Sequence, residues 1–255
     1  MDDSEVKLVN ALARGFSIIN AYGALSKELS SKELSDITGL PKQTLFRMLD
    51  TLCELHVLRH NKVTAKYRLH TRMLGLGANV LYRMPVKQIA RPYMQSLANH
   101  IHGQVQLTVA AGGYMNSVEV SHGQDSMLFR PEIGMPVSIT KTAAGRAYFN
   151  SVDASVQAEV VELMQRKGRD LAQFEALMHS AQQHLAEHGY TKSVGDLHKE
   201  IVSIAVPMKH PVDDDCYVFS LSIPVYSELL DQLDSNLAPR LMTLVKTVEN
   251  AMGSY

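Results

Sequence analysis

The chain has 255 residues, a mass of 28.3 kDa, a formal net charge of −1 and two cysteines that lie far apart, Cys53 and Cys216. It has no apolar run near the ~20 residues of a membrane span, no basic-then-apolar N-terminus of the secretory kind, and no cysteine spacing typical of a disulfide framework or a metal site. These features exclude membrane-spanning and disulfide-rich secreted classes, so we expect a cytoplasmic globular protein of one large domain or two smaller ones.

The charge is distributed unevenly along the chain. Residues 1–83 carry 12 Lys and Arg against 8 Asp and Glu, whereas residues 84–255 carry 13 against 18. Within residues 39–83 there are 8 basic and 2 acidic side chains. A local basic surplus is typical of a surface that contacts phosphates, although an ordinary solvated surface can have the same composition.

Two helices are predicted before residue 40. Apolar residues at intervals of three and four predict a first helix over about residues 4–22 (Val9, Leu12, Phe16 and Ile19). The polar stretch that follows breaks this pattern. A short second helix is predicted over residues 31–38, because Ser30 or Ser31 stands before Glu33 at the spacing of a capping box.

A helix-turn-helix is predicted at this point. Gly39 suits the left-handed conformation that ends a helix, and Pro41 suits the first turn of the next helix, expected over residues 41–55. Four apolar residues of that helix form a stripe expected to be buried (Leu45, Met48, Leu49 and Leu52). Hydrogen-bonding side chains lie off the stripe, near the end that would enter a major groove (Lys42, Gln43, Thr44 and Arg47). Gln pairs well with adenine and Arg with guanine; the alternative is that these side chains are simply solvated.

A β-hairpin is predicted after this helix. Residues 57–60 and 66–69 alternate as strands do, and residues 61–65 connect them. We expect a basic wing, with Lys62 and Lys66 along phosphates or at the edge of a minor groove.

Two apolar helical stripes follow the wing. One covers residues 71–84, and the other covers residues 86–101, where Pro92 is expected to kink or restart the helix at Arg91. These stripes fit helix pairing between subunits and equally fit core packing within one chain. The expected domains are a DNA-binding domain over residues 1–70, a linker helix over 71–85 and a second domain over 86–255.

The last part of the chain predicts an α+β domain with an antiparallel sheet, because strand pairs come first, helices follow, and strands return before a final helix. The expected strands are 105–111, 116–121, 127–130, 135–139, 200–209 and 217–223, and the expected helices are 142–150, 155–167, 171–188 and 226–252.

Several motifs resemble the IclR family of bacterial transcriptional regulators. They lie at residues 14–19, 34–49, 67–69, 134–147, 189–190 and 202–207. The resemblance implies a winged helix-turn-helix and, over residues 86–255, a GAF-like effector-binding and oligomerisation domain that binds a small organic acid, aromatic acids included. It also implies a homodimer or homotetramer on a near-palindromic double-stranded operator. The expected DNA-contacting residues are Arg14, Ser31, Lys42, Gln43, Thr44, Arg47, Lys62 and Lys66.

Candidate effector-binding residues surround the expected helix start near Thr142. A carboxylate needs hydroxyls, backbone N–H groups or a cation, and small residues at a helix start would let it approach the N–H groups. The resemblance places Ser203, Ser220 and Ser222 on strands facing this site, and the strand period of two puts the last two on one face. The expected set is Leu128 as an apolar wall, with Thr142, Ala143, Ala144, Ser193, Ser203, Ser220 and Ser222.

The chain departs from the family at this site. The family often has Cys at the position of Ser203, glycine at the position of Glu200, and an acidic cluster where only Asp196 is acidic here. The effector therefore stays open.

An enzyme is the less favoured interpretation. There is no glycine-rich phosphate loop, no Gly-x-Ser-x-Gly motif and no evident acid–base pair, so no catalytic residue, metal or cofactor is expected. His184 and His188 are four residues apart without a third ligand, which favours a surface pair. Two alternatives remain open: a DNA-binding regulator whose second domain only oligomerises, and a GAF-like domain with hydrolase activity.

Overall fold

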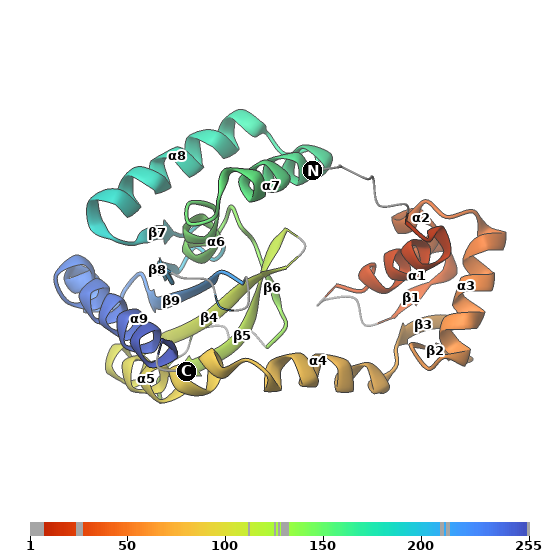
Figure 1. Ribbon diagram of the computed structural model, residues 1–255, viewed down its shortest axis with the longest axis horizontal. Coiled ribbons are helices and arrows are strands. Elements are labelled where there is room, and N and C mark those ends of the chain that lie inside the picture. The colour runs from red at the N-terminus through yellow and green to blue at the C-terminus, as the bar shows by residue number, and fades with distance from the viewer. Residues whose placement is uncertain are drawn as a thin grey trace. The chain divides into compact units, whose positions relative to one another are not determined.

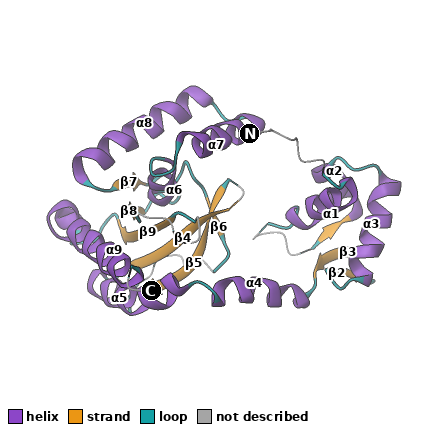
Figure 2. Cartoon of the chain, in the orientation of Figure 1, coloured by secondary structure: helices purple, strands orange, loops and turns teal. Residues whose placement is uncertain are grey.

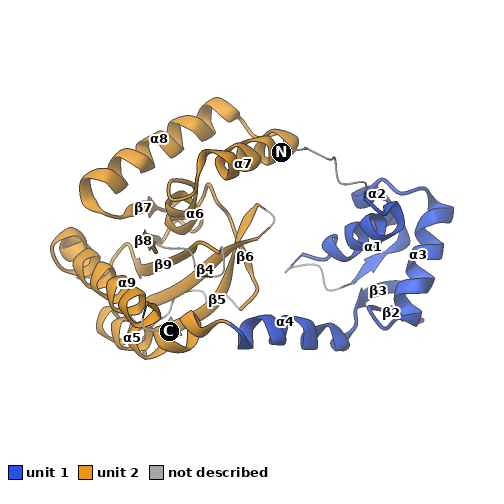
Figure 3. Ribbon diagram, viewed as in Figure 1, with its two compact units in different colours: residues 1–83 blue, residues 84–255 orange. Residues whose placement is uncertain are grey.

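The computed structural model divides the chain into two compact units, residues 1–83 and 84–255 (Figure 3). It describes residues 8–23, 28–111, 113–124, 126, 128, 133–209, 212 and 215–253. The expected start of the first helix, at residues 4–7, and all but Leu128 of the strand expected at 127–130 lie outside the described residues. Each unit has a hydrophobic core of its own.

The first unit is a winged helix-turn-helix that continues into a linker helix (Figure 1). Its three-stranded sheet is antiparallel with the order β1-β3-β2. The short strand β1 was not predicted, because two residues carry no alternating pattern. The elements are α1 (Asn10–Asn20), β1 (Leu29–Ser30), α2 (Ser31–Thr38), α3 (Lys42–Glu54), β2 (Leu58–Asn61), β3 (Lys66–Leu69), a 3₁₀ turn η1 (Thr71–Met73) and α4 (Leu74–Tyr82).

Local signals set the boundaries of the helix-turn-helix. The capping box is confirmed: the Ser30 hydroxyl accepts a hydrogen bond from the Glu33 N–H, and the Glu33 carboxylate accepts one from the Ser30 N–H. Gly39 ends α2 in the left-handed conformation, with φ at +67°. The apolar stripe of α3 is buried as predicted, except that Met48 is only half-buried. The unit's core includes Ile18, Leu34, Leu45, Leu49, Leu52 and Leu58.

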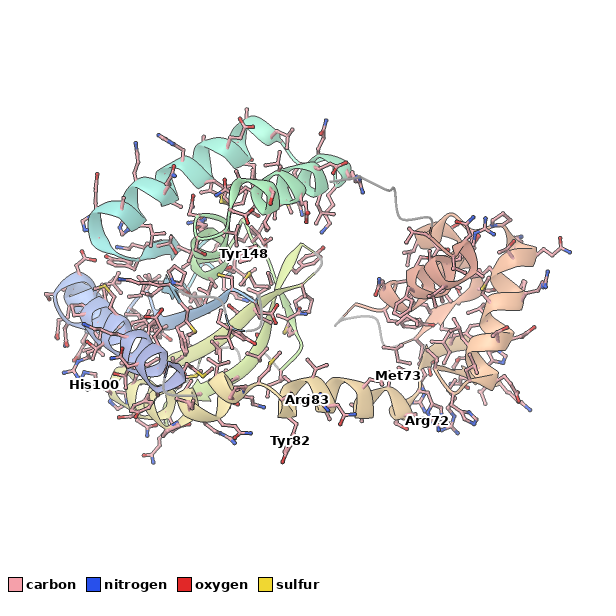
Figure 4. The ribbon with its side chains drawn as sticks, in the orientation of Figure 1. Arg72, Met73, Tyr82, Arg83, His100 and Tyr148 are labelled. Carbon is pink, nitrogen blue, oxygen red and sulfur yellow. The ribbon has the colours of Figure 1, made fainter. Side chains whose placement is uncertain are left out.

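Helices α1 and α4 leave apolar side chains uncovered within their own unit. Helix α1 starts at Asn10, and of its predicted stripe Val9, Leu12 and Phe16 are exposed, because α1 contacts α2 and α3 through the side that carries Ile18. Helix α4 has no buried residue. Tyr82 is 81% exposed and projects away from α4 (Figure 4). The other large exposed apolar residues of α4 are Leu74, Leu76 and Val80.

The second unit is an α+β domain around one six-stranded antiparallel sheet (Figure 2). The strand order is β6-β5-β4-β9-β8-β7. The elements are α5 (Pro85–Ile101), β4 (Gln104–Ala111), β5 (Tyr114–His122), β6 (Pro136–Val137), α6 (Ala143–Phe149), α7 (Ala154–Arg166), α8 (Leu171–His188), β7 (Thr191–Val194), β8 (Ile201–Pro207), β9 (Tyr217–Pro224), a 3₁₀ turn η2 (Leu230–Gln232), a π-helical segment η3 (Leu233–Leu237) and α9 (Ala238–Met252).

Helices cover both faces of this sheet (Figure 1). Lys87 and Arg91 of α5 lie 3.5 Å from the carboxylate of Glu119, which pairs across the sheet with Leu107, so α5 covers the face of Leu107. Helix α9 packs against α5. Helix α6 contacts Thr191 on the opposite face, where the Thr191 hydroxyl donates to the Ala143 carbonyl over 2.7 Å.

The structure differs from the expected elements at three places. No restart occurs at Pro92: α5 runs through it as one helix, because buried residues on both sides of the proline pack on the sheet. The tail expected as one helix over residues 226–252 is α9 from Ala238 onward, preceded by η2 and η3. Pro239, which lacks an N–H, lies in the first turn of α9, where that donor is not needed. The four-residue edge strand β7 was missed because it is short.

Candidate functional site

The first nine residues of α3 turn five exposed side chains outward, which we call the outward face of α3: Lys42, Gln43, Phe46, Arg47 and Asp50. They are exposed because the opposite side of α3 supplies Leu45, Leu49 and Leu52 to the core. Of the four polar residues predicted here, Lys42, Gln43 and Arg47 lie on this face, whereas Thr44 is half-buried. The sequence analysis did not single out Phe46.

The carboxylate of Glu33, in the first turn of α2, is held in place by several hydrogen bonds. The Glu33 carboxylate accepts hydrogen bonds of 2.7 Å from both the hydroxyl and the N–H of Ser30, and these bonds lower the pKa of Glu33. The ammonium of Lys66, from the wing, lies 3.8 Å from the same carboxylate. Ser31 is half-buried as the first residue of α2. Lys66 is thus partly neutralised, whereas Lys62 is exposed.

The wing loop is fixed by a carboxylate that precedes β1. Glu28 accepts hydrogen bonds from the Asn61 side-chain amide over 3.2 Å and the Thr64 hydroxyl over 3.0 Å, and these bonds lower the pKa of Glu28. Asn61 in turn accepts from the Val63 N–H over 3.0 Å. Ala65 adopts a positive φ of 54° to close the hairpin. Arg14, the remaining residue of the predicted DNA-contacting set, is exposed on α1.

In the second unit, the face of the sheet turned toward α6 carries two rows of polar side chains. Backbone pairing aligns Ser193, Ser203, Ser222 and Gln104 across β7, β8, β9 and β4. The next row contains Ser220 and Gln106. We call these six residues the polar sheet face. The two glutamines were missed because no local motif marks them.

Four members of the polar sheet face bond within the set, and the Gln104 amide lies 3.4 Å from the Gln106 side-chain carbonyl oxygen. The hydroxyls of Ser203 and Ser222 lie 2.7 Å apart, and the Gln106 amide donates to the hydroxyl of Ser117. Ser220 is 5% exposed, and its hydroxyl is not one of the fully buried polar atoms that lack a hydrogen-bond partner in the described part of the chain. Hydroxyl and amide groups can both donate and accept hydrogen bonds, so this face offers both kinds of partner to a polar ligand.

The start of α6 is tightly packed. The Thr142 hydroxyl accepts from the Gly145 N–H over 3.1 Å and donates to the Ser138 carbonyl over 2.7 Å. Ala143 and Ala144 belong to the core of this unit. A Cβ at Gly145 would lie 2.2 Å from Cα of Ile139. The small residues therefore serve the close approach of α6 to the preceding segment, a role that the sequence analysis did not predict.

Arg146 is a buried cation that is already neutralised. Its guanidinium lies 2.6 Å from the Asp196 carboxylate and donates to the Thr140 and Lys192 carbonyls. Burial acts to raise the pKa of Asp196, but hydrogen bonds from Arg146 and Ser193 outweigh it and hold the pKa below its ordinary value. Ser193 also donates to the Lys141 carbonyl over 3.3 Å. Ser193 and Arg146 thus brace β7 against the start of α6.

The remaining predicted positions carry less information. Leu128 is half-buried in the segment between β5 and β6. The rings of His184 and His188 lie 4.5 Å apart, and Nδ1 of His184 is 2.8 Å from the Tyr190 carbonyl oxygen. No group of three or more His, Cys, Asp or Glu suited to a metal occurs among the described residues. In the same part of the chain, no helix has the length and apolar character needed to cross a bilayer.

The comparisons with known proteins cover almost the whole chain. A model of the IclR helix-turn-helix domain matches residues 11–62, and a model of the C-terminal domain of bacterial transcriptional regulators of the IclR type matches residues 78–249. The HTH-type transcriptional regulator TsaQ1/TsaQ2 of Comamonas testosteroni is 25% identical over 255 residues, which are 99% of this chain and 91% of that protein.

Two solved structures have the same arrangement of elements. An IclR family transcriptional regulator from Brucella abortus has a TM-score of 0.89 and 26% identity, with 98% of this chain and 94% of that one covered. An IclR homologue from Microbacterium hydrocarbonoxydans, complexed with 4-hydroxybenzoate, has a TM-score of 0.72 over 96% of this chain and 100% of its own. At 16% identity, the second likeness shows the fold alone.

Proposed function

Because this chain belongs to the IclR family of bacterial transcriptional regulators, we propose that its first unit binds operator DNA through the outward face of α3 and the wing, under the control of a small organic acid in the second unit. The observation that carries the proposal is the outward face itself. It presents an amide and a guanidinium, the groups that pair with adenine and guanine in the major groove, on a helix anchored by a buried stripe.

The other predicted DNA contacts have positioning roles. Lys42 and Lys62 are exposed cations suited to phosphates. Lys66 also contacts a phosphate once the phosphate replaces the Glu33 carboxylate as its partner. Ser31 offers a backbone N–H at the start of α2, and Arg14 offers a cation on α1. These groups set the position of the protein on the duplex. Thr44 supports the start of α3, whereas Gln43 and Arg47 select the base sequence.

The effector site is the polar sheet face. Ser203, Ser220 and Ser222 bind the carboxylate or hydroxyl groups of the acid together with Gln104 and Gln106, because Arg146 already has its charge neutralised by Asp196. Thr142, Ala143, Ala144, Ser193 and Leu128 form the walls. The alignment of six hydrogen-bonding side chains on one face of the sheet supports this placement, and the 4-hydroxybenzoate bound to the Microbacterium homologue supports an aromatic acid.

A second copy of the chain covers α1 and α4, giving a homodimer or a pair of dimers. Six exposed large apolar side chains on two helices are more than an isolated unit leaves in water without a partner (Leu12, Phe16, Leu74, Leu76, Val80 and Tyr82). A two-fold dimer presents two copies of α3, which fits a near-palindromic operator.

Since α4 and α5 are separated only by Arg83 and Met84, a change in the second unit reaches the first through this connection. Effector and operator then alter each other's affinity by the same factor.

A ligand screen tests the effector half of the proposal. The full chain is heated with a panel of small organic acids, with and without aromatic rings, and an acid at 100 times its dissociation constant raises the unfolding free energy by ~2.7 kcal/mol. Ser220→Ala should weaken the best acid about tenfold, because one hydrogen bond to a charged group is lost. The matched control is Ser235→Ala, an exposed serine of η3. A panel without a stabilising acid would favour the ligand-free oligomerisation domain, and turnover of an acid would favour the hydrolase.

A further inference from the structure

Phe46 is the one apolar member of the outward face of α3. The residue is 46% exposed, although phenylalanine is ordinarily buried. It takes no part in the core of the first unit, which α3 reaches through Leu45, Leu49 and Leu52. The fold therefore does not account for an aromatic ring at this position.

The surroundings of Phe46 are those of a base-reading surface. Gln43 is three residues before it, Arg47 follows it and Asp50 is four residues after it, so polar side chains flank the ring along one helical face. The uncovered apolar residues assigned above to a second copy belong to other helices, α1 and α4. A single exposed aromatic ring among hydrogen-bonding side chains is complementary to a partner surface that is polar but carries isolated apolar groups.

The major groove offers one such apolar point, the C5-methyl group of thymine. We propose that Phe46 selects thymine in the operator by packing against this methyl group. The assignment rests on the proposed function, because it requires α3 to lie in the major groove. Three residues of helix advance about 4.5 Å, close to the spacing of about 3.4 Å between base pairs. The thymine is therefore adjacent to a base pair contacted by Gln43 or Arg47.

Replacing thymine by deoxyuridine tests this assignment, because it removes the methyl group and leaves the hydrogen-bonding groups unchanged. The operator is first obtained by in vitro selection with the full wild-type chain. Each thymine is then replaced singly by deoxyuridine, and dissociation constants are measured at fixed salt. Loss of one buried methyl group should weaken wild-type binding about fourfold at one position of each half-site. Phe46→Ala should bind the thymine operator more weakly and show no penalty at that position.

Two controls separate recognition from folding and from other apolar contacts. Phe46→Ala should keep the wild-type unfolding midpoint, because the side chain lies outside the core. It should also form the same oligomer in solution as the wild-type chain. Val63→Ala changes another exposed apolar residue, at the wing, and should keep the deoxyuridine penalty unchanged.

The outcomes distinguish this assignment from the proposed function. Sequence-selective binding without a deoxyuridine penalty, or with a penalty that persists in Phe46→Ala, overturns the role of Phe46 alone. A change of oligomeric state in Phe46→Ala also overturns it, because the ring would then contact another protein chain. A wild-type chain that enriches no sequence overturns the proposed function and the assignment with it.

Discussion

The outward face of α3 and the polar sheet face both present hydrogen-bonding side chains, but they are built differently. The first comes from nine consecutive residues of one helix and is exposed to solvent. The second is largely buried and is assembled from β4, β7, β8 and β9, and its β4 and β9 members pair across more than 100 residues of sequence. A change on α3 should therefore affect binding and leave stability intact, whereas a change around the polar sheet face should affect both.

The largest effect is expected where α6 meets the segment before it. Gly145→Ala places a Cβ 2.2 Å from Cα of Ile139, and backbone cannot yield as a flexible side chain does. We expect the second unit to lose about 3 kcal/mol of unfolding free energy, measured by denaturant titration with circular dichroism. Gly253→Ala, whose new Cβ would be 3.6 Å from its nearest neighbour, should change stability by less than about 0.5 kcal/mol. Equal stability of the two variants would contradict the close packing of α6.

The counterpart on α3 is Arg47→Ala. We expect a loss of about 1–3 kcal/mol in binding to the selected operator, with a much smaller loss on random DNA, if the guanidinium contacts a guanine. The unfolding free energy should change by less than about 0.5 kcal/mol, because the side chain is exposed. Fluorescence anisotropy on both DNAs measures the difference. Equal losses would show that Arg47 contacts a phosphate instead.

A smaller, pH-dependent effect is expected at the pair that braces β7. The folded state holds the pKa of Asp196 below its ordinary value, so the ionised carboxylate stabilises the fold above about pH 4, and this contribution is lost as the pH falls through the folded pKa. Asp196→Asn should cost about 1 kcal/mol at pH 7, a modest figure because this side chain is 41% exposed. Its difference from wild type should shrink in acid. A difference independent of pH would show that Arg146 and Asp196 do not interact as an ion pair.

The smallest effect is expected in the wing, where Ala65 has a φ of +54°. Ala65→Gly should stabilise the first unit by about 0.5 kcal/mol, since glycine adopts this conformation without steric cost. Ala13→Gly, at an exposed position within α1, should instead destabilise it by about 1 kcal/mol. Thermal unfolding followed by circular dichroism compares the two. Destabilisation by both would show that the wing does not hold this backbone conformation in solution.

The same contrast explains what could be predicted from the sequence. Ser30, Glu33 and Gly39 lie within ten consecutive residues, so the bounds of α2 were predicted and confirmed. The serines of the polar sheet face were suggested only by the family resemblance. Gln104 and Gln106 were missed, because their neighbours become known only when β4 is seen beside β9.

Two further differences also depend on tertiary structure. Arg146 and Asp196 are 50 residues apart, and no local pattern predicts their contact. The exposed stripes of α1 and α4 look like core residues in sequence, because periodicity reports an apolar face without reporting what covers it. The residue-by-residue contacts with DNA and effector therefore stay predictions.

The most direct test of the account is the ratio of affinities of the full chain for its selected operator and for a scrambled duplex of the same length and composition, measured in one buffer of physiological salt. The account predicts a ratio of about 10³ or more, together with a two-fold symmetric selected sequence. A ratio near one, or a selected sequence without symmetry, would contradict the central claim that two copies of α3 recognise an operator.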